Sequence, residues 1–174
     1  MGTRSNRGMV LEHMIEASNR TYRDKGMALV TKRPTPIRIE RITAGKVYGH
    51  LEKASTVDFD GVYQRRALQF EAKQTGDTSL PLANFHEHQI THLRQAVQHG
   101  AVAFVIVEFT RKRQTFYLPA ERLFTAWDNR IGGRKSIAYD DIALTCLEIK
   151  SGRGVPLDYL ACVDEVLRQE KLIA

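Results

Sequence analysis

Apolar residues recur along the chain at two spacings, one typical of helices and one typical of strands. A broad apolar stripe at helical spacing runs from Met9 to Tyr22, and Gly26 is placed to end that helix. Residues 101–109 are almost continuously β-branched or apolar, as in a buried central strand. Together these patterns predict helices over residues 8–23, 85–99, 120–129 and 158–169, and strands over residues 27–31, 56–63, 68–73, 101–109, 115–118 and 144–149.

Residues 33–53 have a different pattern from the rest. Ile37, Ile39 and Ile42 alternate with charged residues, and a turn is expected at residues 44–46. The segment is therefore expected to be a long protruding hairpin, able to reach into or between nucleic-acid strands, with an ordinary two-sided surface hairpin as the alternative. Its basic residues are Arg33, Arg38, Arg41, Lys46 and Lys53.

The order of helices and strands indicates an α/β or α+β sandwich with the charged hairpin at an exposed end of the sheet. A length of 174 residues with 43% hydrophobic content suits one domain over residues 1–174. No apolar run approaches the ~20 residues of a membrane span, and residues 1–7 lack the apolar stretch of a signal peptide. We therefore expect a cytoplasmic protein with no membrane partner, in which Cys146 and Cys162 are buried and unpaired.

The positive charge of the chain is concentrated in its first third. Residues 1–54 hold 11 Lys and Arg residues against 5 Asp and Glu residues, whereas the remaining residues hold 15 of each kind. A basic arm on an electrically balanced body favours a polyanion partner, because binding releases counterions from a phosphate backbone. Nucleic acid is the leading partner class, and a role in solubility alone is the alternative.

Asp58, Glu71 and Lys73 are the candidate catalytic residues. If residues 68–73 form a strand, Glu71 and Lys73 project from one face, and an antiparallel pairing with residues 56–63 brings Asp58 alongside Glu71. Two carboxylates suit Mg²⁺, which prefers oxygen ligands and keeps several waters. A lysine beside them can orient or deprotonate a nucleophile, so this set favours phosphodiester hydrolysis.

Two simpler explanations compete with that site. An acidic residue followed by a Glu-x-Lys triplet occurs by chance in many chains, and a solvated strand face explains it as well. His86, His88 and His92 could in principle ligate zinc, but no cysteine or carboxylate completes the set, so surface or phosphate-facing histidines are favoured. Phe124 and Trp127 have helical spacing and are expected in the core.

Six blocks of residues span almost the whole chain: Asn6-Arg7-Gly8-Met9 with Leu11-Glu12, Pro34-Thr35-Pro36, Ser55-Thr56-Val57-Asp58, Phe70-Glu71-Ala72-Lys73, Asn84-Phe85-His86 with His88-Gln89, and Gly133-Arg134-Lys135-Ser136. Together, and in the order of the family, they resemble the RecU-type Holliday junction resolvases. Six matched blocks are far more specific than one Glu-x-Lys triplet. The chain departs from the family pattern at Gln74, where relatives often carry an acidic residue, and in its short lead before Asn6.

The resemblance implies a restriction-endonuclease-like fold of the PD-(D/E)xK nuclease class, with a central mixed sheet flanked by helices. It further implies a homodimer that binds four-way junction DNA and makes paired, symmetric cuts with Mg²⁺ or Mn²⁺. Residues 33–53 would be the basic stalk that points toward the junction centre. A nucleoid-associated location is expected, and a RecA-type recombinase is a further candidate partner.

Carried over by position, the resemblance makes Asp58 and Glu71 metal ligands and Lys73 the residue that positions water or stabilises developing charge. Glu12 matches an acidic helix position that such nucleases direct at the metal, with a solvated helix position as the alternative. Asp60 is expected in a turn before Gly61. The candidate nucleic-acid contacts, each with a solvated or helix-surface alternative, are Arg7, Arg33, Arg38, Arg41, Lys46, Arg66, Gln89 and Arg134.

The leading hypothesis is a structure-selective, metal-dependent endonuclease that resolves four-way junctions in recombination and repair. One alternative is a restriction-like nuclease that cuts ordinary duplex DNA. The other is a junction-binding or recombination-modulating protein without turnover, for which the hairpin matters and the carboxylates do not.

Overall fold

The computed structural model describes residues 4–51 and 56–173, and the side chains of residues 9–50 and 56–170. Lys53, at the end of the predicted stalk, lies outside the described residues. The helices are α1 (Arg4–Asp24), the 3-10 helix η1 (Leu82–Asn84), α2 (Glu87–Gln98), α3 (Ala120–Asp128), α4 (Tyr139–Thr145) and α5 (Tyr159–Ile173). The strands are β1 (Ala28–Lys32), β2 (Ile37–Thr43), β3 (Lys46–Leu51), β4 (Phe59–Tyr63), β5 (Arg66–Thr75), β6 (Ser79–Pro81), β7 (Val102–Phe109), β8 (Gln114–Pro119), β9 (Ser136–Ala138) and β10 (Leu147–Glu148).

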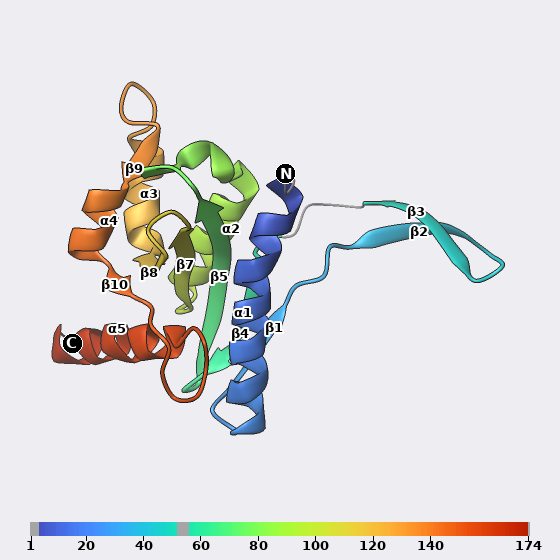
Figure 1. Ribbon diagram of the computed structural model, residues 1–174, viewed down its shortest axis with the longest axis horizontal. Coiled ribbons are helices and arrows are strands. Elements are labelled where there is room, and N and C mark those ends of the chain that lie inside the picture. The colour runs from blue at the N-terminus through green and yellow to red at the C-terminus, as the bar shows by residue number, and fades with distance from the viewer. Residues whose placement is uncertain (1–3, 52–55, 174) are drawn as a thin grey trace.

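A six-stranded sheet in the order β1-β4-β5-β7-β8-β10 forms the centre of the fold (Figure 1). Strands β5 and β7 pair in parallel, while the other neighbours pair antiparallel, so the sheet is mixed. The parallel pair is possible because α2 forms the crossover between β5 and β7. The predicted central mixed sheet flanked by helices is confirmed.

Each face of the sheet buries its own apolar cluster. On one face, α1 and α5 cover aromatic side chains, and the rings of Phe59, Phe70, Phe104 and Tyr117 stack in a row across four strands with centroid separations of 5.0, 4.6 and 4.5 Å. On the other face, α2 and α3 cover the aliphatic side chains of β7 and β8. Because strand side chains alternate between faces, Glu71 on β5 points away from the aromatic row, toward α2.

Strands β2 and β3 form a separate two-stranded sheet that extends away from the rest of the fold (Figure 1). Ala44 and Gly45 both have positive φ and make the tight turn that closes it. Every residue of β2 is exposed, including Ile37, Ile39 and Ile42, so neither face of this hairpin packs against the body. Residues 37–51 thus form an exposed hairpin, and its role as a stalk stays a prediction.

Several local predictions differ from the structure. Asp60 lies inside β4 instead of in a turn, because β4 pairs with both β1 and β5 through this position. The second helix begins at Glu87 with His86 as its N-cap, and Asn84 belongs to the preceding 3-10 helix. Strands β6 and β9, which pair with each other, and helix α4, which follows β9, were not among the predicted elements. These elements are short, so the sequence holds few periods of any pattern.

Cys146 and Cys162 are both free, as expected, and Cys162 is buried whereas Cys146 is only partly buried. Phe124 and Trp127 are buried in the core, as their spacing predicts. Within the described part of the chain, no helix combines the length and apolar character needed to cross a membrane.

The aromatic row gives a test of the packing. We expect Phe104→Ala to lower the free energy of unfolding by about 3–5 kcal/mol, because Phe104 is fully buried between Phe70 and Tyr117 and its removal leaves a cavity. Urea denaturation followed by far-UV circular dichroism measures the change. The control is Val62→Ala, which shortens an exposed side chain on β4 and should change the free energy of unfolding by less than about 0.5 kcal/mol. Equal effects of the two substitutions would contradict this description of the core.

Candidate active site

The antiparallel pairing of β4 with β5 brings Asp58 next to Glu71. Phe59 pairs with Phe70, so Asp58, one residue before β4, lies opposite the next residue of β5. A carboxylate oxygen of Asp58 accepts a hydrogen bond from the backbone N–H of Ala72 at 2.9 Å, and the Asp58 carbonyl accepts one from the N–H of Arg33 at 2.8 Å. Backbone donors from two segments therefore fix the position of Asp58.

Glu71 and Lys73 project from the same face of β5, as predicted. The ammonium of Lys73 donates to Oε2 of Glu71 at 2.7 Å and lies 3.9 Å from the nearer carboxylate oxygen of Asp58. The side chain of Glu71 is completely buried, whereas those of Asp58 and Lys73 are 26% and 16% exposed. The three predicted catalytic side chains thus converge, and two of them remain accessible from solvent.

Gln89 on α2 holds the buried carboxylate from the other side. Its amide nitrogen donates to Oε2 of Glu71 at 2.7 Å, and its amide oxygen accepts from the backbone N–H of His86 at 3.0 Å. The bond to His86 requires the amide oxygen to face the helix start, so the amide nitrogen must face Glu71. Gln89 is buried, which excludes the helix-surface alternative and suits the positioning of Glu71 better than direct contact with nucleic acid.

Burial raises the pKa of Glu71 from its ordinary value of 4.5 to about 8. The Lys73 ammonium opposes this shift by stabilising the ionised form, and the neighbouring Asp58 carboxylate adds to it. Oε1 of Glu71 is buried and, when both carboxyls are ionised, has no hydrogen-bond donor among the described residues. The fold therefore leaves one oxygen of this buried carboxyl group without a donor, although Lys73 contacts the other oxygen.

A divalent cation suits this arrangement. The uncompensated Oε1 of Glu71 lies beside the Asp58 carboxylate, and carboxylate oxygens are the ligands that Mg²⁺ and Mn²⁺ prefer. These two residues could hold such an ion, which would also favour the ionised form of Glu71. Within the described residues no group of three His, Cys, Asp or Glu side chains gathers around one point, so further ligands would be water or substrate oxygens.

The carboxylate of Glu12, the third predicted ligand, forms an ion pair with Lys32. Glu12 lies on α1, which packs on the aromatic face of the sheet, and its carboxylate accepts from the Lys32 ammonium at 2.5 Å. The pKa of Lys32 is raised, mainly by this hydrogen bond and also by the charges of Glu16 and Asp58. Lys32 therefore interacts with the charges of both Glu12 and Asp58, and sequence reasoning did not identify it.

Arg33 and Asp60 flank the site. The guanidinium of Arg33 donates to an Asp60 carboxylate oxygen at 3.1 Å and to the hydroxyl of Thr56. This pair fixes the segment that leads from β1 to the hairpin against the start of β4. Arg33 is thus a structural link at the base of the hairpin as well as a candidate phosphate contact.

The remaining predicted contacts are dispersed. Arg38, Arg41 and Lys46 lie on the exposed hairpin, where the Arg41 guanidinium covers the ring of Tyr48 at 4.8 Å. Arg66 starts β5 at the end remote from Lys73 and pairs with Glu170 on α5 at 3.2 Å. Arg134 is 84% exposed and lies 3.4 Å from Asp141. Arg7 belongs to α1, but its side chain lies outside those described.

The three histidines do not form a common site. The rings of His86 and His88 stack at 5.5 Å, whereas His92 contacts Gln69 on β5 at 3.0 Å. Burial lowers the pKa of His92, and the nearby Arg33 adds to this shift. His92 therefore serves packing between α2 and the sheet, and the zinc alternative has no geometric support.

The chain is similar to known proteins over most of its length. Residues 6–165 match the family model described as "RecU: Recombination protein U". The chain is 41% identical over 169 residues to the Holliday junction resolvase RecU of Geobacillus sp., with 92% of this chain and 84% of the relative covered. It is 41% identical over 175 residues to the same-named protein of Lactobacillus delbrueckii subsp. bulgaricus, with 96% and 83% covered.

A solved structure of Hjc, a Holliday junction resolvase from Archaeoglobus fulgidus, has 16% identity and a TM-score of 0.49, with 83% of this chain and 93% of that one covered. The fold and site define a mixed α/β protein with two carboxylates and a lysine at the meeting point of two strands. With most of its length matched by the family model and by the curated relatives, the chain belongs to the RecU family.

The raised pKa of Glu71 gives a test without substrate. Folded protein keeps a proton on Glu71 that unfolded protein has released, so in EDTA this group's contribution to stability is present below pH 4.5 and is lost as pH rises to about 8. Glu71→Gln cannot ionise, so its free energy of unfolding relative to wild type should rise across this window by on the order of 1–3 kcal/mol.

Urea denaturation at several pH values, with and without Mg²⁺, measures this difference. Glu87→Gln, which alters an exposed carboxylate on α2, is the matched control and should run parallel to wild type. Parallel curves for Glu71→Gln and wild type would contradict the assigned pKa.

Proposed function

We propose that this protein is a metal-dependent endonuclease that resolves four-way DNA junctions by paired, symmetric phosphodiester hydrolysis in recombination and repair. The convergence of Asp58, Glu71 and Lys73 carries the proposal, since family membership alone names no residue. The names of the relatives, Holliday junction resolvase RecU, supply the substrate class.

Asp58 and Glu71 would hold a Mg²⁺ or Mn²⁺ ion. When bound, such an ion supplies positive charge at the scissile phosphate and lowers the pKa of a bound water. The protein's own contribution is positional: Ala72 N–H fixes Asp58, and Gln89 and Lys73 fix one oxygen of Glu71 so that the other stays available. Lys73, partly exposed, can orient the attacking water and stabilise charge that develops on the phosphate.

The hairpin and the oligomeric state complete the proposal. A junction has two equivalent strands to cut, so a two-fold homodimer with one site per subunit matches its symmetry. The exposed β2–β3 hairpin carries Arg38, Arg41 and Lys46 away from the body and suits the stalk that points at the junction centre. We further propose one restriction-endonuclease-like nuclease domain acting in the cytoplasm at the nucleoid, with a RecA-type recombinase as a candidate partner.

A cleavage assay on a synthetic mobile four-way junction tests the activity. With Mg²⁺ we expect Asp58→Asn, Glu71→Gln and Lys73→Ala each to lower the single-turnover rate at least about a hundredfold, because each removes a group from the reacting centre. The matched control Glu87→Gln, which alters an exposed carboxylate paired with Arg130, should cleave within about twofold of wild type. Wild-type rates in any of the three site variants would refute the assigned site.

The same assay separates the two alternatives. Linear duplex of equal length cut as fast as the junction would indicate a restriction-like nuclease. Junction binding in EDTA with no cleavage in any divalent metal would indicate a binding protein without turnover.

The hairpin is tested through binding. Replacing Arg38, Arg41 and Lys46 together by Gln should weaken junction binding in EDTA and lower the slope of log affinity against log salt by about 0.9 for each phosphate that is no longer neutralised. The thermal midpoint should stay the same, because β2 and β3 pair only with each other. Fluorescence anisotropy at several salt concentrations measures affinity and slope, and an unchanged salt slope would count against the stalk.

A further inference from the structure

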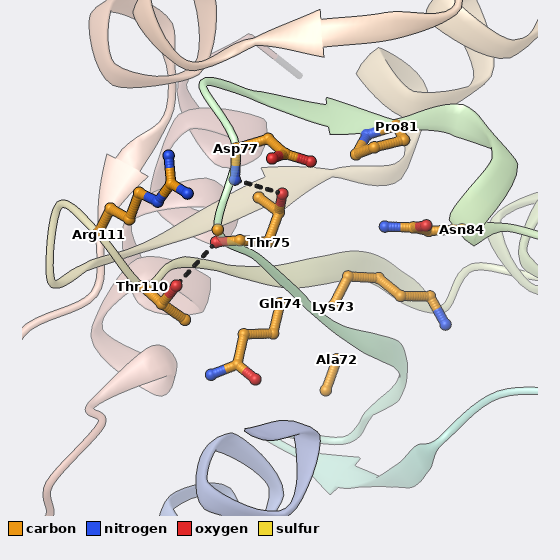
Figure 2. A pocket seen from close by; sticks show the side chains of 10 residues that line it. Ala72, Lys73, Gln74, Thr75, Asp77, Pro81, Asn84, Thr110 and Arg111 are labelled. Atoms are coloured by element: carbon orange, nitrogen blue, oxygen red, sulfur yellow. Dashed lines mark hydrogen bonds between the residues drawn. The ribbon is translucent and has the colours of Figure 1, made fainter. Parts of the chain in front are cut away.

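A cavity of about 840 Å³ continues from the active site along the end of β5. Figure 2 shows Lys73 and Asn84 at one end of it and Arg111 and Thr110 at the other, with Asp77 on the wall between them. We call this cavity the β5 groove. Its side chains are mostly polar or charged, and none of the nucleic-acid contacts expected from the sequence lines it.

The groove exists because β5 is longer than its neighbour. The ladder between β4 and β5 stops at the pair Phe59 and Phe70, whereas β5 continues to Thr75. Beyond this last pair, the N–H of Ala72 has no partner on β4 and donates instead to the carboxylate of Asp58. Because backbone groups alternate in direction along a strand, the N–H and C=O of Gln74 point to the same side of β5 as the N–H of Ala72.

Arg111 is the available cation of this groove. It lies in the turn between β7 and β8, where Lys112 covers the ring of Tyr139 at 5.0 Å. Arg111 is exposed, and no carboxylate in residues 9–50 or 56–170 forms an ion pair with it. The Asn84 amide, which also lines the groove, has no hydrogen-bond partner among the described residues. An unpaired guanidinium and an unpaired amide thus face one channel that begins at Lys73.

We infer that the β5 groove holds the backbone of the cut strand beside the scissile bond, with Arg111 binding one of its phosphates. The inference rests on the proposed function and adds a binding residue to its site. Lys73 is in register with Val107, and Arg111 follows four residues later, at most about 13 Å along the strand direction. A DNA strand carries one charge per ~3.4 Å of axis, so the phosphate lies within about four nucleotides of the cut.

In this inference, Asp77 repels the DNA backbone and so keeps it on the Arg111 side of the β5 groove. Its carboxylate forms no ion pair with any described residue and lies on the groove wall with Arg111 (Figure 2). A polyanion in the groove is repelled by Asp77 and attracted by Arg111, so neutralising the two residues must change affinity in opposite directions. A role in folding alone would not produce opposite signs.

An added peptide strand is the other occupant that an open β-edge can accept. Strand addition gains specificity from pockets for alternate side chains, usually apolar ones. The β5 groove offers Lys73, Asn84, Asp77 and Arg111 instead, and it leads directly into the proposed phosphodiester-cleaving centre. These features favour nucleic acid.

Binding of a synthetic four-way junction in EDTA tests the inference with the full-length protein. We expect Arg111→Gln to weaken binding about tenfold and to lower the salt slope by about 0.9, and Arg111→Lys to keep the slope. Asp77→Asn should tighten binding. The matched control is Arg65→Gln, an exposed arginine at the opposite end of β5, which should change neither quantity.

Neutral methylphosphonate linkages placed one at a time along the cut strand locate the contact. Wild-type protein should lose affinity for one linkage within about four nucleotides of the cut, and Arg111→Gln should not respond to that linkage. Identical affinities and identical linkage profiles in wild type and Arg111→Gln would overturn the inference. Failure of the wild type to cut the junction in Mg²⁺ would instead overturn the proposed function, since the binding measurements need no cleavage.

Discussion

The register of β4 against β5 is the constraint on which the candidate site depends. One pairing, Phe59 with Phe70, places the aromatic rings in the stacked row on one face and at the same time sets Asp58 beside Glu71 on the other. A shift of one residue in this pairing would move both the aromatic side chains and the carboxylates to the wrong faces of the sheet. The aromatic core therefore stabilises the geometry of the charged centre, although the two lie on opposite sides of the sheet.

Burial of Glu71 follows from the same arrangement. A carboxylate in this position is costly unless it has donors or a cation, and Lys73 and Gln89 satisfy only one of its oxygens. Burial raises the pKa of this carboxyl group to about 8, which favours its protonated form at neutral pH. In the proposed site a metal ion would take the place of that proton and favour the ionised form of Glu71.

Much of this could be predicted from the sequence, for identifiable reasons. The strand pair that carries Asp58 and Glu71 was predictable because alternation and a short turn fix register locally. The neighbourhood of Glu12 was not, since its contact with Lys32 depends on how α1 packs against the adjacent strand β1. Gln89 was singled out by position, but its bond to Glu71 depends on where α2 begins, and the helix predicted from residue 85 begins instead at Glu87. The β5 groove had no sequence signal, because it results from β4 being shorter than β5.

The exposed hairpin formed by β2 and β3 has an energetic consequence. A two-stranded ribbon with no core beneath it is marginally stable in water, so its backbone is expected to sample many conformations when nothing is bound. Ordering it on a partner then subtracts conformational entropy from the affinity. Under the proposed function, such an arm would bind less tightly than a rigid one but could adapt to the shape of the DNA.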